Sequence, residues 1–222
     1  MVSWVFWFAV ILAPSLIGLT FAVRAARRVT RAERALRALA ARPGWRLLER
    51  GDDGAEWAGY AGHFPWLLSA RPRTTVTGPV GERQVTIGRL VKSVSRRVDA
   101  HWLVLCFDLP AAGPGVRLER HWSAAHLNLR FPEDLPYLPV SDHVAQTAAR
   151  LEATDLTDRL LRLAAPAVSL AGDQACFVYF PLPEVLDMDA LLAGLAGLLP
   201  DLVALARDTA PEDAPGNGTG RP

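Results

Sequence analysis

The chain has 222 residues, of which 50% are hydrophobic and 21% charged, enough for one domain with a real core and too apolar for a globally disordered protein. The net charge of +1 hides a strong asymmetry. Nine arginines and only two glutamates lie between Arg24 and Arg50, a local charge of +7, so the remainder of the chain carries −6. A short basic segment beside an acidic body is unlike a nucleic-acid-binding domain, and no nucleic-acid partner is expected.

Residues 4–23 form an uncharged apolar run of 20 residues, the length that a helix needs to cross a hydrocarbon core of about 30 Å. Trp4 and Trp7 lie where interfacial anchors are expected. No Arg or Lys precedes the run, whereas arginines follow it at once, so the positive-inside rule predicts a single-pass cell-membrane protein with its N-terminus outside and its main domain in the cytoplasm. A cleaved signal peptide is disfavoured, because neither a basic stretch before the run nor a small-residue cleavage site after it is evident.

Residues 24–42 are rich in Ala, Arg and Leu and predict a continuing helix, which Pro43-Gly44 ends. At about 100° per residue, one face collects the arginines and another collects apolar residues. The two sets are Arg24, Arg27, Arg28, Arg31 and Arg34, and Val29, Ala32, Leu36 and Leu39. Two hypotheses follow: the arginine face lies on the anionic inner leaflet, or the arginines only set the topology of an ordinary connecting helix. The predicted organisation is 1–23 transmembrane anchor, 24–42 juxtamembrane helix, 43–207 cytoplasmic domain and 208–222 disordered tail.

Beyond residue 43, hydrophobic alternation predicts strands first and helices afterwards. The expected strands are 73–78, 84–91, 101–109, 116–122 and 126–131, and the expected helices are 142–151, 155–163 and 187–206. A short hairpin over 167–180, turning at Gly172-Asp173, is expected between the last two helices. This order predicts an α+β fold: an N-terminal transmembrane helix, then an antiparallel β-sheet with the C-terminal helices packed on one face and water on the other.

Few residues suggest chemistry. No phosphate-binding, metalloprotease or nucleophile-elbow string occurs, and no cofactor is expected. Cys106 and Cys176 lie in apolar runs and are predicted to be buried thiols, because a disulfide is not expected in a reducing cytoplasm. Asp108, Asp99 and His101 stand near strand ends, where polar residues need no special role.

One constellation could bind a metal. If strands 116–122 and 126–131 pair as a hairpin, His121 and His126 face each other and Glu119 lies on the same side, so that two imidazoles and a carboxylate converge. The alternative is a set of solvated side chains on an exposed sheet face. The tryptophan-rich stretch 45–66 poses a similar choice between an apolar ligand pocket and the closure of one end of the core.

The layout resembles single-pass membrane proteins of actinobacteria that carry a domain of unknown function. The resemblance rests on the N-terminal span with its arginine-rich flank, Gly44-Trp45, the string Arg71–Gly78, the apolar strand ending at Leu109-Pro110, and the closing leucine-rich helix. Residues 84–91 depart from that pattern, because they lack the expected aromatic residues. The resemblance implies no activity. The favoured function is a binding or scaffolding module for an unknown protein partner at the inner membrane surface; the alternative is a small-ligand or metal-binding sensor or enzyme with a site on the sheet.

Overall fold

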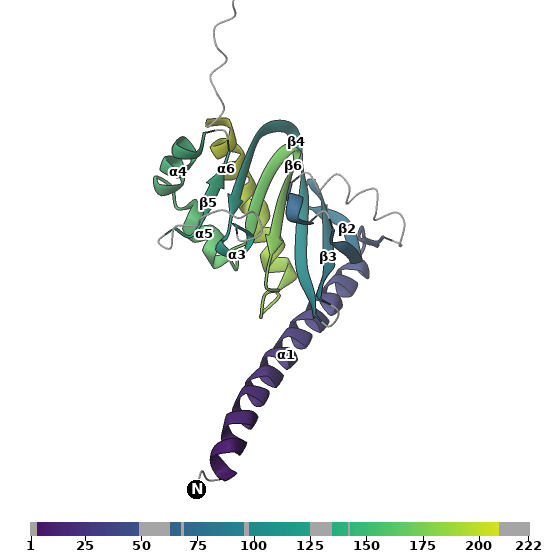
Figure 1. Cartoon of the computed structure of the whole chain (residues 1–222). Coiled ribbons are helices and arrows are strands. Elements are labelled where there is room, and N and C mark those ends of the chain that lie inside the picture. Colours follow the sequence, from purple (N-terminus) through teal and green to yellow (C-terminus); the bar gives the residue numbers. More distant parts are fainter. Residues whose placement is uncertain are drawn as a thin grey trace, which may run out of the picture.

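The structure is a computed structural model that describes residues 4–48, 63–67, 69–95, 98–124, 135–141 and 143–208 (Figure 1). Its helical elements are α1 (Trp4–Ala40), a 3₁₀ turn (Pro65–Leu67), α3 (His121–Ala124), α4 (Val144–Glu152), α5 (Leu156–Arg162) and α6 (Met188–Asp208). Its strands are β1 (Arg46–Leu47), β2 (Arg71–Val80), β3 (Arg83–Ser95), β4 (Val98–Glu119), β5 (Leu138–Val140) and β6 (Ala167–Tyr179). The predicted α+β class and antiparallel pairing are confirmed, because every strand pair is antiparallel.

Strand β4 organises the sheet. The six strands follow the order β1-β2-β3-β4-β5, and β6 pairs with β4. β4 pairs with β3 from Val98 to Phe107 and with β6 from Leu103 to Leu118 (Figure 1). The prediction of two strands here, ending and restarting around Pro110, was wrong. Proline lacks a ladder donor, but the register between β4 and β6 shifts twice between Asp108 and Val116, and such irregularities tolerate proline.

The predicted hairpin at Gly172-Asp173 was also wrong, because β6 is one strand from Ala167 to Tyr179. Gly172 does have a positive φ of 58°, as a tight turn requires. The strand continues through it, however, since Gly172 pairs with Gly113 of β4 at the point where both strands leave regular register. The glycine therefore marks a bulge in a long pair of strands.

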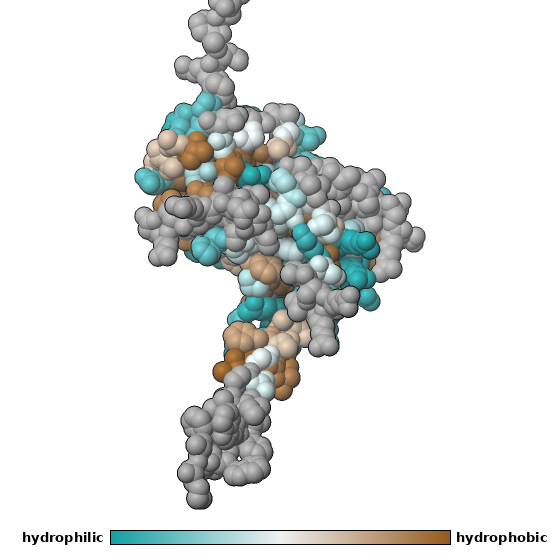
Figure 2. All heavy atoms as spheres, in the orientation of Figure 1, coloured by the Kyte–Doolittle hydropathy of each residue, from teal (hydrophilic) through white to brown (hydrophobic). Residues whose placement is uncertain are grey.

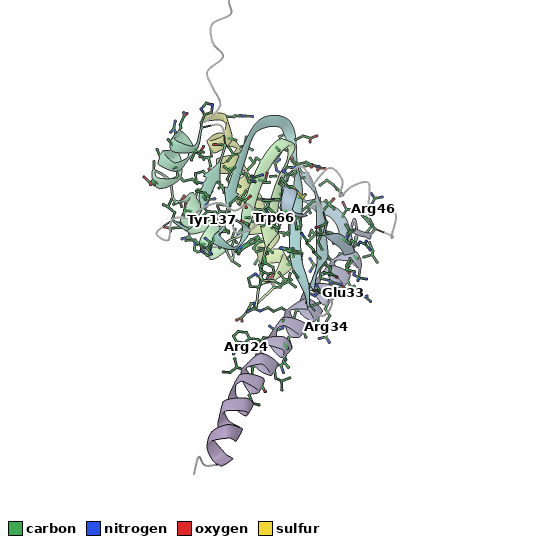
Figure 3. The ribbon with its side chains drawn as sticks, in the orientation of Figure 1. Arg24, Glu33, Arg34, Arg46, Trp66 and Tyr137 are labelled. Atoms are coloured by element: carbon green, nitrogen blue, oxygen red, sulfur yellow. A yellow bond between two sulfur atoms is a disulfide. The ribbon has the colours of Figure 1, made fainter. Side chains whose placement is uncertain are left out.

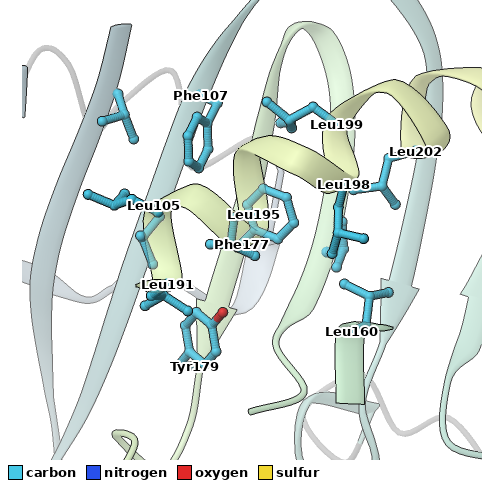
Figure 4. Close-up of a cluster of buried hydrophobic side chains, with 14 of the residues drawn as sticks. Leu105, Phe107, Leu160, Phe177, Tyr179, Leu191, Leu195, Leu198, Leu199 and Leu202 are labelled. Atoms are coloured by element: carbon cyan, nitrogen blue, oxygen red, sulfur yellow. The ribbon is translucent and has the colours of Figure 1, made fainter. Parts of the chain in front are cut away.

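One face of the sheet carries the main core. The leucine stripe predicted for the last helix, at 191, 195, 198, 202 and 205, is buried along α6. It packs over Phe107 of β4 and over Phe177 and Tyr179 of β6 (Figure 4). Full burial of one such side chain contributes about 1.5–3 kcal/mol, so α6 is a major source of stability.

The second half of α1 belongs to the same core. Ala32, Leu36 and Leu39 are at most 1% exposed and lie in the cluster formed by α6 and the sheet, with Val29 packed at its edge. These residues form the apolar face predicted for residues 24–42. Burial of that face against the sheet means that the helix is part of the folded domain along residues 29–40.

The other face of the sheet is apolar too, which contradicts the expected wet face. Trp102, Val104 and Val178 project from it and are covered by Phe64 and Trp66 of the segment before β2. Trp66 lies 5.4 Å from Phe64 and 6.2 Å from Trp102, measured between ring centroids. Sequence alternation alone does not reveal this second layer, because the covering segment has no regular period.

Among the residues described, one helix is long and apolar enough by composition to cross a membrane, Met188–Arg207. Its leucines form the main core, however, with Leu195, Leu199 and Leu202 fully buried. A buried core helix of a folded domain has this same composition. α6 is therefore explained by packing within the domain.

Gly78 of β2 has a packing requirement that can be tested. A Cβ at this position would lie 2.3 Å from Cδ2 of Trp45, whose ring rests on the glycine. We expect Gly78→Ala to lower the free energy of unfolding by about 1–3 kcal/mol, because the indole must move out of its site. Urea unfolding of the full-length protein in detergent, followed by tryptophan fluorescence, measures the change.

Gly197→Ala is the matched control. A Cβ at Gly197 in α6 meets no atom within 4 Å, so alanine should leave stability unchanged or raise it by up to about 1 kcal/mol. Equal stability of Gly78→Ala and the wild type would contradict the packing of Trp45 on β2.

Candidate functional site

The first polar feature of interest is the contact between α1 and the sheet. Glu33 of α1 accepts hydrogen bonds from Oγ1 of Thr74 at 2.6 Å and from Nε of Arg89 at 3.1 Å. Its other oxygen accepts one from Nε of Arg37 at 3.0 Å. Arg89 in turn lies 3.3 Å from Nδ1 of His101, nitrogen to nitrogen. A single carboxylate thus ties α1 to β2 and β3, and through Arg89 to β4.

Electrostatics favour the ionised form of Glu33. Burial alone raises the pKa of its carboxyl, but the hydrogen bonds from Thr74 and Arg37 and the charge of Arg89 outweigh burial and leave the pKa below its usual value. Burial and then Arg89 lower the pKa of His101, against the opposing charge of Asp99. His101 is therefore held neutral at pH 7 beside the Arg89 guanidinium.

A second set of contacts ties α1 to the loop between β6 and α6. Arg28 binds the carboxylate of Glu184, and Nη1 of Arg31 donates to the Glu184 carbonyl oxygen at 2.6 Å. Hydrogen bonding and the charge of Arg28 lower the pKa of Glu184. At the end of the helix, Arg42 binds both carboxylate oxygens of Asp189 in α6. These pairs fix the rotation of α1 against the domain.

The predicted arginine face is therefore divided between two uses. Arg28 and Arg31 contact the domain, whereas Arg24, Arg27 and Arg34 are exposed. Figure 3 shows Arg24 on the part of α1 that leaves the domain, and Glu33 where the helix meets the sheet. The exposed three remain available to an anionic surface.

The structure describes two of the three residues of the predicted metal constellation, Glu119 and His121. Glu119 ends β4 and is fully buried, with Arg117 forming an ion pair at 2.8 Å between Nε and Oε1. His121 begins the short helix α3 and is exposed, and His126 lies outside the described residues. His121 does not lie in the predicted strand, because Ser123 bonds back to Arg120, donating to its carbonyl oxygen and accepting from its amide, and the chain turns into α3. The predicted partner strand 126–131 lies outside the described residues. The described residues contain no cluster of three metal-ligating side chains.

The two cysteines are paired, contrary to expectation. Cys106 and Cys176 occupy directly opposite positions of β4 and β6, with Cα atoms 4.2 Å apart, and form a disulfide. Both are fully buried in the second apolar layer, as predicted. The sequence could not reveal their pairing, because the register of the two strands was not known.

One nucleophile and base lie together. Nδ1 of His63 is 3.2 Å from Oγ of Ser169 on β6, and burial lowers the pKa of the histidine, so the ring is neutral. Both residues are buried, His63 at 4% and Ser169 at 3% exposure, and a substrate would not reach them. We interpret this pair as a polar contact that fastens the segment 63–67 to the sheet.

The remaining predictions for this region have simple outcomes. Trp45 packs on Gly78 and Trp66 closes the second apolar layer, so the described tryptophans of stretch 45–66 cover cores. Asp108 is exposed, and its carbonyl oxygen lies next to Arg83 at the turn between β2 and β3. Partial burial of its carboxyl and the charge of Asp173 raise its pKa. Asp99 accepts a hydrogen bond from Ser93 at 2.8 Å.

Sequence reasoning missed Glu33, whose carboxylate accepts hydrogen bonds from three side chains. It did assign an apolar face to residues 29–39, but the spacing of Glu33 indicates only its local i,i+4 pair with Arg37, and its partners on β2 and β3 depend on how α1 packs on the sheet. It also missed the basic end of the sheet, where Arg71, Arg73 and Lys92 border a hollow of about 350 Å³. Their common location depends on the pairing of β2 with β3.

These contacts define the class of the molecule: an α+β domain built on the second half of a long N-terminal helix. No protein-family model, curated protein or solved structure matches this chain. The similarity to actinobacterial single-pass membrane proteins stays a prediction.

The carboxylate of Glu33 makes a testable contribution to stability. We expect Glu33→Gln to lower the free energy of unfolding at pH 7 by about 1 kcal/mol, a value reduced for its partial exposure, because the charge-assisted bonds are weakened. The lowered pKa means that this contribution is present above the unfolded pKa of about 4.3 and is lost as pH falls through the lower folded pKa. Unfolding curves at pH 7 and near pH 3 should show the difference between wild type and variant shrinking.

Glu82→Gln serves as the control, since Glu82 is exposed in the turn between β2 and β3. Its effect should be close to zero at both pH values. A Glu33 effect that is the same at both pH values would show that the negative charge is not what stabilises the contact.

Proposed function

We propose that this protein is a single-pass membrane protein whose N-terminal helix anchors a binding or scaffolding domain at the inner membrane surface. The observation that carries this proposal is the continuity of α1, which runs for 37 residues from Trp4 to Ala40 without interruption. One helix therefore contains both the apolar run of residues 4–23 and a face buried in the domain core.

The exposed part of α1 has the surface of a helix that needs an apolar environment. Leu16, Ile17, Leu19 and Phe21 are between 56% and 65% exposed. Figure 2 shows hydrophobic side chains around this part of the helix and a hydrophilic zone where it meets the domain. Thr20 donates to the carbonyl oxygen of Ile17 at 2.7 Å, which satisfies its hydroxyl within the helix, as a membrane interior requires. A bilayer would remove this surface from water.

The lengths agree with this assignment. Residues 4–23 of a helix rise about 30 Å, the thickness of a hydrocarbon core. Trp4 starts α1 and Trp7 lies one turn later, at the position of an outer interface. Val29, the first residue of α1 packed against the core, follows Val23 by only about 9 Å of helix. The domain is thereby held close to the membrane surface.

Two features support the binding role. α1 is buried along one face in the core of the domain and so would hold the domain close to the membrane surface, and Arg24, Arg27 and Arg34 are exposed beyond the apolar segment. An unknown protein partner beside the anchored chain and the anionic leaflet itself are the proposed partners. The alternative, a small-ligand or metal-binding sensor or enzyme, would draw on His126, so its test is metal binding by the full chain. A zinc adduct in native mass spectra that His121→Ala removes would favour this alternative.

Anchoring is tested by placing charge in the exposed segment. We expect the double variant Leu16→Arg/Ile17→Arg to move the protein from the membrane fraction to the soluble or aggregated fraction, because each central arginine costs about 2.5–3.5 kcal/mol on insertion. The measurement is the fraction of full-length protein retained in membranes after carbonate extraction.

Leu47→Arg is the matched control, because Leu47 is also an exposed leucine, at 53%, but lies in β1 of the domain. This variant should remain in the membrane pellet. Release of the wild type by carbonate would overturn the anchoring proposal.

Two observations bear on orientation, and they point in opposite directions. The arginines that follow Val23 at once favour a cytoplasmic domain. The disulfide between Cys106 and Cys176 favours an oxidising compartment, because cytoplasmic thiols are kept reduced. We propose the cytoplasmic orientation, in which the adjacent pair would be a dithiol in the cell.

We expect a fluorescent protein fused after Pro222, of a kind that matures only in the cytoplasm, to be bright. Cys106 and Cys176 should both be alkylated when cells are denatured and quenched with a thiol reagent. An active alkaline phosphatase fusion at the same site, together with cysteines that react only after reduction, would place the domain outside and contradict the proposal.

A further inference from the structure

A basic hollow lies where β2 begins and β3 approaches its end. Its volume is about 350 Å³, and its lining is Ser69, Arg71, Arg73, Val91, Lys92 and Ser93. Half of these residues are cationic and none is acidic. Arg71 and Arg73 are exposed and Lys92 is half-buried, so the three charges border the hollow without being enclosed.

The hollow lies on an open part of the sheet. β1 pairs with β2 only at Val76 and Thr77, so the stretch from Arg71 to Arg73 is a free edge among the strands described. The bulge between Pro72 and Thr74 places Arg73 outside the regular pairing with β3. Asp99, on the neighbouring β4, accepts a hydrogen bond from Ser93 at the rim.

The position of this hollow relative to the apolar end of α1 follows from two contacts with β2. Glu33 accepts a hydrogen bond from Thr74, and beyond the helix Gly44 lies beside Pro79, where an added Cβ would be 3.3 Å from Cγ of Pro79. The two contacts come in the same chain order on both segments, so β2 runs away from the apolar end of α1 and Arg71 lies on the side of Thr74 that is nearer to that end.

The lengths of strand and helix place the cations. Arg71 precedes Thr74 by three residues, about 10 Å of strand, and Glu33 follows Val23 by ten residues, about 15 Å of helix. Lys92 follows Val91, the partner of Arg71, and lies further toward the membrane. The hollow therefore lies on the side of the domain that faces the exposed Arg24 and Arg27, which follow the apolar segment ending at Val23.

We propose that this hollow binds the phosphate group of an anionic lipid in the leaflet next to the domain. The inference rests on the proposed anchoring of α1, which sets the hollow on the side of the domain that faces the headgroups. Guanidinium groups bind phosphate oxygens in a bidentate manner, a lysine adds a point charge, and the serine hydroxyls supply neutral donors. A monoanionic or dianionic headgroup fits this set of donors. The quaternary ammonium of a zwitterionic choline headgroup would be repelled by the three cationic side chains.

The test uses the full-length protein reconstituted into nanodiscs that contain phosphatidylcholine and phosphatidylglycerol. Native mass spectrometry after release from the disc counts the phosphatidylglycerol molecules that remain bound. We expect Arg71→Ala/Lys92→Ala to lower their retention by about 25-fold, because each of the two basic residues contributes about fivefold at an anionic surface. Arg71→Lys should retain most of the binding.

The control is Arg83→Ala/Arg162→Ala, which removes two cations away from the hollow. Arg83 begins β3 opposite Val80, at the far end of the same strand pair, and Arg162 ends α5. This variant should bind phosphatidylglycerol as the wild type does. Equal loss in both double variants, or no loss in either, would overturn the headgroup site.

Two further outcomes separate the sources of the phosphate and the two proposals. If inorganic phosphate displaces no phosphatidylglycerol from the wild type in nanodiscs, the lipid assignment is supported. If inorganic phosphate binds the detergent-solubilised protein through Arg71 and Lys92 while phosphatidylglycerol does not, the lipid assignment is overturned. A chain that does not enter nanodiscs at all refutes the anchoring itself. A chain that enters them but binds both lipids equally refutes only the headgroup site.

Discussion

The burial of one face of α1 in the domain core is the constraint on which the rest of the structure depends. Leu36 and Leu39 close the core between the sheet and α6, and Glu33 adds a carboxylate that three donors hold. The helix therefore cannot swing away from the domain without exposing leucines and leaving Arg89 without its carboxylate. Every proposal about the membrane follows from this rigid connection.

The sequence predicted the fold class because periodicity is strong where one face of an element is buried. The leucine stripe of α6 and the apolar face of residues 29–39 were read correctly for that reason. The sequence-based prediction of strand ends failed where the pairing with a neighbouring strand decides whether a strand continues. The junctions at Pro110 and Gly172 carry turn residues, yet β4 and β6 support each other through a bulge, and only the partner strand reveals this.

The candidate sites show the same division. Arg24, Arg27 and Arg34 could be assigned to an exposed face from helical spacing alone. The proposed metal site depended on an assumed hairpin between strands 116–122 and 126–131. The hydrogen bond from Ser123 to the carbonyl oxygen of Arg120 places His121 in the short helix α3 instead of a strand. The basic hollow and the disulfide both require residues about 20 and 70 positions apart to meet, which no local pattern encodes.

The lack of a linker between the apolar segment and the domain has a mechanical consequence. Helices adapt to bilayers of different thickness mainly by tilting. Because α1 continues into the core, a change in its tilt would turn the whole sheet with it. In a chain anchored as we propose, thinning or thickening of the bilayer would thus change which surface of the domain faces the membrane and the angle at which the domain meets the proposed partner.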